Sequence, residues 1–136
     1  FFFLIRVLHM FNKSIFVMLG GALGAWCRFA LQQKMPFQWA NVTVSTLVIN
    51  VVGGFLMGSL AAWLMSKSAV DQLLWRALLM SGFCGGFTTF SAFSLEMWQL
   101  LQAGKPANAI AMALAHVGLS LVAVMLGWYV VRGSVH

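Results

Sequence analysis

Three long stretches without a charged residue constrain how this chain can fold. They are residues 41–66, 77–95 and 106–131, and a fourth apolar stretch, 14–31, contains one charge, Arg28, near its end. About 20 helical residues cross a hydrocarbon core of ~30 Å. Because lipid cannot hydrogen-bond to the backbone, a crossing segment must satisfy its own peptide groups. The sequence therefore predicts an all-α integral membrane protein with four transmembrane helices.

The four spans use up most of the 136 residues, which predicts a single membrane domain over residues 1–136. We place the spans at about 14–31, 41–65, 72–102 and 106–132. Only 7% of the residues are charged, against about 25% in a soluble domain. Residues 1–10 are apolar but too short for a span, and they have no small-residue cleavage site, so we expect no signal peptide.

The net charge of +6 would suggest a nucleic-acid partner in a soluble protein. Here most of the basic residues lie at or near span ends, where lipid headgroups and water meet them. Membrane lipid, and not nucleic acid, is therefore the expected partner. The basic residues at span ends are Lys13, Lys34, Lys67, Arg76, Lys105 and Arg132.

The same residues bear on orientation in the membrane. With four spans, both termini and the loop after the second span share one side. That side has Arg6, Lys13, Lys67, Arg76 and Arg132, and the other side has Arg28, Lys34 and Lys105. Since the bias of basic residues sets topology, so small a difference permits insertion in both directions. We expect an antiparallel, dual-topology homodimer, with one fixed orientation as the alternative.

The segment 82–94, GFCGGFTTFSAFS, lies in the middle of the third span and combines glycines, hydroxyls and phenyl rings. Glycine in a helix interior costs roughly 1 kcal/mol relative to alanine. We therefore expect the third helix to break in the middle of the membrane and form two half-helices. Irregular backbone at that depth is tolerated where it is buried in protein or lines a cavity. This segment is the first candidate for a functional site.

No catalytic set of residues emerges, so an enzyme is not expected. The polar residues inside the spans are mostly neutral, and two pairs four residues apart share a helix face: Thr46 with Asn50, and His116 with Ser120. These stripes and the hydroxyls of 82–94 can form a polar track across the bilayer. Alternatively, the hydroxyls bond to carbonyls of their own helices. The track residues are Thr46, Asn50, Thr88, Thr89, Ser91, Ser94, His116 and Ser120.

Three further residues have two readings each. Glu96 is an acid within the third span, which makes it either a functional residue or a partner for a hydroxyl or Arg near the interface. Phe90 and Phe93 are three residues apart and can project from one side of the second half-helix. Their ring edges are positive and can face a small anion, although such pairs more often face lipid or the core.

Together these residues resemble those of a known family, the small fluoride channels called Fluc or CrcB. The resemblance covers the chain from about Met10 onward and is most specific in segment 82–94, followed by Glu96. In the first two spans the matching residues are Gly20, Gly21, Gly24, Arg28, Thr46, Asn50, Gly53 and Gly58.

The resemblance implies four-helix subunits paired antiparallel, with two fluoride pathways per homodimer and passive export of fluoride across the bacterial inner membrane. It implies a central sodium ion held by the backbone carbonyls of Gly85 and Thr88. It also implies that Asn50 is the pore amide and that Phe90 and Phe93 are the phenylalanine box. On the fourth span, Ser120 matches the polar track. His116 departs from it, since Ser or Asn is common there.

Two other classes compete with this interpretation. A small proton-coupled multidrug exporter would also have four helices, but it requires a carboxylate in the first span, and 14–31 has none. A packing subunit without a pathway would have no use for buried amide and hydroxyl groups, which are costly in lipid.

Overall fold

The computed structural model describes residues 2–40 and 42–134, with side chains described from residue 13 onward. Within these ranges, four helical stretches are long and apolar enough to cross a membrane, which confirms a multi-pass helical fold: Lys13–Lys34, Ser45–Leu64, Ala69–Gln102 and Pro106–Ser134. The elements in chain order are α1 (Phe2–Lys34), β1 (Gln38–Trp39), β2 (Val42–Thr43), α2 (Ser45–Leu64), α3 (Ala69–Trp75), η1 (Arg76–Cys84), α4 (Gly85–Phe87), α5 (Phe90–Gln102) and α6 (Pro106–Ser134).

The start of the second span differs from the prediction. Strands β1 and β2 form a two-residue antiparallel hairpin, in which Gln38 pairs with Thr43 and Trp39 with Val42. Helix α2 therefore begins at Ser45 and not at residue 41. The all-α prediction is wrong to this small extent, because the first connection folds into a hairpin. Helix α1 also runs through residues 2–13, which the sequence placed outside the first span.

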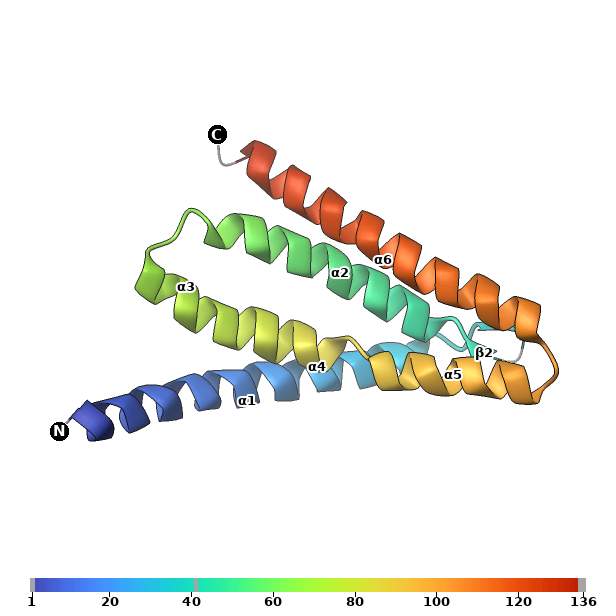
Figure 1. Ribbon diagram of the computed structural model, residues 1–136, viewed down its shortest axis with the longest axis horizontal. Coiled ribbons are helices and arrows are strands. Elements are labelled where there is room, and N and C mark those ends of the chain that lie inside the picture. The colour runs from blue at the N-terminus through green and yellow to red at the C-terminus, as the bar shows by residue number, and fades with distance from the viewer. Residues whose placement is uncertain (1, 41, 135–136) are drawn as a thin grey trace.

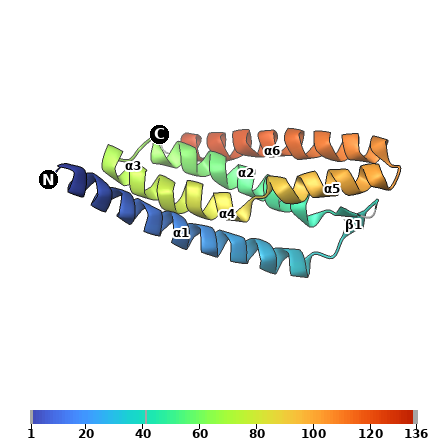
Figure 2. The same ribbon diagram turned by 60° about the horizontal axis from the view of Figure 1, so that its bottom comes forward.

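The helices form two closely packed pairs. Helix α2 packs along α6, and α1 packs along η1 and α4. In Figure 1 the first part of the third span, from α3 to α4, lies between α1 and α2, and α5 continues beside α6 toward the hairpin end. Figure 2 shows the same helices from another side. Both termini and the α2–α3 connection lie at one end, and the hairpin and the α5–α6 turn lie at the other. The chain therefore runs back and forth as four spans require.

Glycines set the spacing within both pairs. A Cβ added at Gly24 of α1 would overlap the carbonyl oxygen of Phe83 on η1, and one added at Gly86 of α4 would overlap the carbonyl of Gly21. Between α2 and α6, a Cβ at Gly58 would overlap the carbonyl of Val124. Small residues at such crossings let membrane helices approach backbone to backbone.

The third span is interrupted at Thr88 and Thr89, where both residues have extended backbone angles. The glycines that motivated the prediction of a break are themselves helical: Gly82 lies in the wide turns of η1, and Gly85 and Gly86 lie in α4. The third span is therefore interrupted within segment 82–94, after the glycines. That the interruption lies in the middle of the membrane stays a prediction. Gly82 and Gly86 lie directly against α1, beside Gly20 and Gly21.

The turn from α5 to α6 follows the sequence signal. Gly104 has φ +69°, a left-handed conformation that suits glycine at the end of a helix. The Lys105 N–H donates to the carbonyl of Leu100 at 2.9 Å. Helix α6 then begins at Pro106, a favourable first helical residue because proline has no N–H to satisfy.

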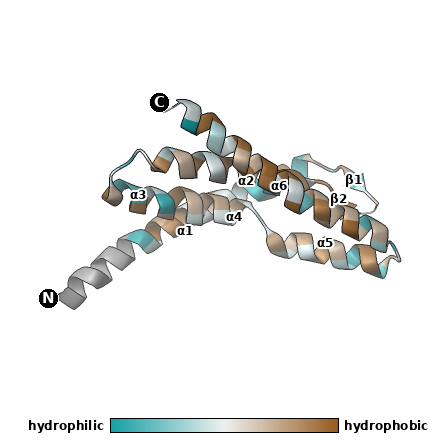
Figure 3. Cartoon of the chain, turned by 45° about the horizontal axis from the view of Figure 1, so that its top comes forward, coloured by the Kyte–Doolittle hydropathy of each residue, from teal (hydrophilic) through white to brown (hydrophobic). Residues whose placement is uncertain are grey.

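The outer surface of the helices is apolar. Many large hydrophobic side chains are exposed, including Trp26 on α1 and Leu114 on α6. Figure 3 shows hydrophobic colours along most of α2 and α6, with polar colours toward the connections. Such a surface is suited to lipid or to another protein chain, and not to water.

We predict that Gly58→Ala lowers the free energy of unfolding by about 1–3 kcal/mol, as overpacking commonly does, because the methyl group would meet the Val124 carbonyl. Thermal unfolding of the purified protein in detergent measures the change. Gly133→Ala is the matched control, since nothing lies within 4 Å of a Cβ added there. Equal stability of the two variants would contradict the proposed close approach of α2 and α6.

Candidate functional site

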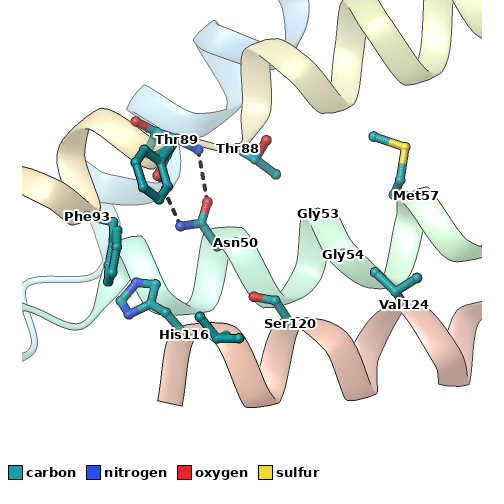
Figure 4. A pocket seen from close by; sticks show the side chains of 12 residues that line it. Asn50, Gly53, Gly54, Met57, Thr88, Thr89, Phe93, His116, Ser120 and Val124 are labelled. Carbon is teal, nitrogen blue, oxygen red and sulfur yellow. Dashed lines mark hydrogen bonds between the residues drawn. The ribbon is translucent and has the colours of Figure 1, made fainter. Parts of the chain in front are cut away.

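The break in the third span is held by one side chain of α2. Asn50 Oδ1 accepts the Thr89 N–H at 2.9 Å, and Asn50 Nδ2 donates to the Thr89 carbonyl at 3.1 Å. Both bonds are drawn in Figure 4. In a continuous helix the Thr89 N–H would instead donate to the carbonyl of Gly85. The Asn50 amide therefore replaces the helical hydrogen bond of the Thr89 N–H and adds one to the Thr89 carbonyl.

Threonine side chains complete both sides of the break. On the α4 side, the Thr88 hydroxyl donates to the Cys84 carbonyl at 2.9 Å. On the α5 side, Thr89 is the N-cap, and its Oγ1 accepts the Ala92 N–H at 3.2 Å. Threonine is a favoured N-cap because its oxygen satisfies a free N–H of the first turn. The positive end of the α5 dipole consequently lies at the break.

A cavity of about 330 Å³ lies beside this break, between α2, α5 and α6. Its wall combines small and polar residues with two phenyl rings, as Figure 4 shows. The lining residues are Asn50, Gly53, Gly54, Met57, Thr88, Thr89, Phe90, Phe93, His116, Val117, Ser120 and Val124.

Aromatic rings contact one another in tilted pairs at one end of this cavity. The ring centroids of Phe90 and Phe93 are 5.4 Å apart, and those of Phe93 and His116 are 4.6 Å apart. Phe90 is 79% exposed, whereas His116 is buried. The His116 Nδ1 lies 3.1 Å from the carbonyl of Met112, and its Nε2 is buried without a hydrogen-bond partner in the described part of the chain.

A second, more polar cavity of about 300 Å³ lies beside the β1–β2 hairpin, between the start of α2 and α5. In its wall the Thr46 hydroxyl donates a short hydrogen bond to Glu96 Oε1. The other carboxyl oxygen, Oε2, is buried and has no partner among the described residues. Of the two readings for Glu96, the structure favours pairing with a hydroxyl, and the pair links α2 to the second half of the third span.

The structure brings most of the predicted residues together. Seven of them line the first cavity, and Thr46 and Glu96 line the second. Ser91 lies at the rim, with its hydroxyl 3.3 Å from that of Thr89. Arg28 is not among the residues that line either cavity. Gly85 is exposed at the start of α4, one turn before the break. The seven are Asn50, Thr88, Thr89, Phe90, Phe93, His116 and Ser120.

The sequence interpretation missed several residues of the second cavity. Gln32, Thr43 and Gln99 line it beside Thr46 and Glu96. Gln32 and Gln99 lie near predicted span ends, where polar residues are ordinary, so their spacing gave no separate signal. Thr43 lies in the hairpin, which brings it over the end of α5.

The fold and the site together define a small multi-pass membrane protein in which an interrupted helix places polar groups beside an intramembrane cavity. Discontinuous helices of this kind form ion and substrate sites in transport proteins. The chain belongs to the CrcB family: the sequence profile described as "CrcB-like protein, Camphor Resistance (CrcB)" matches residues 15–128.

Curated bacterial relatives match nearly the whole chain. The protein named fluoride-specific ion channel FluC 1 of Yersinia pestis is 38% identical over 123 residues, which cover 90% of this chain and 96% of that protein. The fluoride-specific ion channel FluC of Francisella philomiragia is 40% identical over 122 residues, covering 88% and 94%. These findings confirm the family predicted from the residues. Because the relatives are named ion channels, they also confirm that the chain is not an enzyme.

We predict that Asn50→Leu lowers the free energy of unfolding by about 1–3 kcal/mol for each backbone group of Thr89 that loses its partner. Leucine has a similar size but can neither donate nor accept. Thermal unfolding in detergent measures the loss. Ser94→Ala is the control, because Ser94 is exposed and bonds only to its own helix, so its change should stay within about 0.5 kcal/mol. A stable Asn50→Leu variant would show that the break does not depend on Asn50.

Proposed function

We propose that this protein is a fluoride-selective ion channel that exports fluoride passively from the cytoplasm and so relieves fluoride toxicity. The observation that supports it most directly is the interrupted third span held by Asn50, with Phe90 and Phe93 beside the resulting cavity. The names of the relatives supply the identity of the ion. The site supplies the chemistry that an anion requires.

The first cavity offers hydrogen-bond donors without a fixed charge. Asn50 Nδ2 uses one N–H for Thr89, which leaves its second N–H available. The Ser120 hydroxyl projects into the cavity (Figure 4) and makes no hydrogen bond within the described residues. The phenyl rings can present positive edges. Neutral donors replace part of the ion's hydration shell yet bind weakly enough to release it.

We propose passive export because nothing in the sequence suggests energy coupling. Fluoride enters a cell as its neutral acid, dissociates inside and leaves as the anion through the channel. The pathway would pass the first cavity, and the polar residues Thr46, Thr89, Ser91, His116 and Ser120 would line or flank it. Glu96 is bonded to Thr46, which lies one helical turn before Asn50 on α2. Both Thr46 and Glu96 border the second cavity.

The proposal includes a structural sodium ion, held by the carbonyls of Gly85 and Thr88 from each subunit of a homodimer. The backbone geometry fits this role. The Thr89 N–H, the helical partner of the Gly85 carbonyl, bonds to Asn50, and the Ala92 N–H, the helical partner of the Thr88 carbonyl, bonds to Thr89 Oγ1. Both carbonyls thus lose their helical donors, and unwound carbonyls suit Na⁺. A bound cation would raise the local potential for an anion.

The assembly we propose is an antiparallel, dual-topology homodimer in the bacterial inner membrane, with two fluoride pathways. Many large hydrophobic side chains on the helices are exposed, and we propose that lipid and a second copy cover them. Basic residues occur at both ends of the spans with little bias, which supports insertion in both orientations.

We expect the purified protein in liposomes to release fluoride and not chloride. A channel moves net charge, so fluoride release should require valinomycin and potassium to compensate that charge, and ion-selective electrodes would record it. Protein-free liposomes provide the baseline. Chloride release at the same rate, or fluoride release that does not depend on valinomycin, would defeat the assignment of a fluoride-selective channel.

We also predict that Phe90→Ile and Phe93→Ile reduce fluoride release severalfold while the protein stays folded, because isoleucine fills space but has no ring edge for an anion. Phe29→Ile is the matched control, since Phe29 is 60% exposed on α1 and is not among the residues lining the cavity. Size-exclusion chromatography checks the assembly of each variant. Wild-type rates in both cavity variants would assign the two rings to packing alone.

A further inference from the structure

We infer that His116 makes fluoride conduction depend on pH: its protonated ring donates a hydrogen bond to the anion in the first cavity, and its neutral ring does not. The inference rests on the proposed function. It predicts a channel that conducts better in acid.

The hydrogen bond of His116 fixes its neutral tautomer. Nδ1 lies 3.1 Å from the Met112 carbonyl, and a carbonyl can only accept, so Nδ1 carries the proton of the neutral ring. Nε2 is then left with a lone pair. A lone pair repels an anion, whereas the imidazolium ring has an N–H at both nitrogens. Protonation therefore converts Nε2 from an acceptor into a charged donor.

No described group near Nε2 forms a hydrogen bond with it. The side chain is 5% exposed, and Nε2 is buried without a hydrogen-bond partner among the described residues. An unpaired buried polar atom is costly, which calls for an explanation by function. The ring lies in the cavity wall with Asn50 and Ser120, against Phe93 (Figure 4). A fluoride ion in this cavity would meet the donors of Asn50 and Ser120, and a shift of the adjoining imidazole ring would bring its buried Nε2 to the same ion.

Few charges compete with this role. The elements packed against α6 are α2, α5 and the β1–β2 hairpin, whose strands have no ionisable residue. Lys105, directly before α6, donates to the Ala40 carbonyl beside the hairpin. Helix α2 has no ionisable residue, and α5 has only Glu96, whose Oε1 is bonded to Thr46. On α6 itself the other ionisable groups are Tyr129 and Arg132, more than three helical turns away along the chain. Burial opposes a lone imidazolium, and an anion beside it favours one. Proton and fluoride should therefore bind cooperatively.

The test is a recording of fluoride current across planar bilayers that contain the purified protein, at symmetric pH of about 8 and about 5.5, the interval in which imidazole changes charge. Current is the right readout because neutral hydrogen fluoride carries none. We expect the wild-type current to rise severalfold in acid. In His116→Gln and His116→Asn, which stay neutral with an amide donor, the current should be the same at both pH values.

Two controls isolate the residue. His9 and His136 remain in both His116 variants, so a pH dependence that persists there would overturn the inference. Glu96→Gln should retain the rise of the current in acid. If the rise disappears in Glu96→Gln and persists in His116→Gln, the titrating group is Glu96, and the inference about His116 is overturned. A wild-type current that is selective for fluoride but equal at both pH values defeats this inference alone. No fluoride current at either pH contradicts the proposed function itself.

Discussion

The pair of hydrogen bonds between Asn50 and Thr89 is the interaction on which the rest of the site depends. Backbone that leaves a helix inside a membrane must find new partners, since lipid offers none. An asparagine amide has a donor and an acceptor on one short, rigid group, so it can bond to both backbone groups of a single residue. Without it, an interrupted span would be costly, and the helix would tend to close.

The close approach of the helices makes that interaction reachable. Glycines 24 and 86 bring α1 and the first half of the third span together, and Gly53 of α2 leaves room for the Thr88 side chain. A larger residue at Gly53 would push Thr88 away from α2, and a larger residue at Gly24 or Gly86 would push the third span away from α1. The reach of an asparagine side chain is short, so the spacing of the backbones and the bonds of Asn50 depend on each other.

The charge distribution follows from the same arrangement. The break directs the N-terminus of α5 and the free donors of Asn50 and Ser120 toward one cavity, while the acid Glu96 is bonded to Thr46 beside another. A site for a small anion requires this separation, because a carboxylate in the first cavity would compete with the ion for the donors. Neutral groups attract an anion without holding it too strongly.

The number of spans, the interrupted third span and most of the cavity residues could be predicted from the sequence, because hydropathy, helix propensity and four-residue spacing act locally along the chain. The residues that form the break could not be singled out. The sequence placed it within segment 82–94, where Gly82, Gly85 and Gly86 are helical and the break lies where Asn50 meets Thr89. Which polar group bonds to which, including Thr46 with Glu96 and His116 with Met112, was decided only by tertiary structure. The physical reason is that a buried hydrogen bond depends on distances between helices, which side-chain packing sets and which no local pattern encodes.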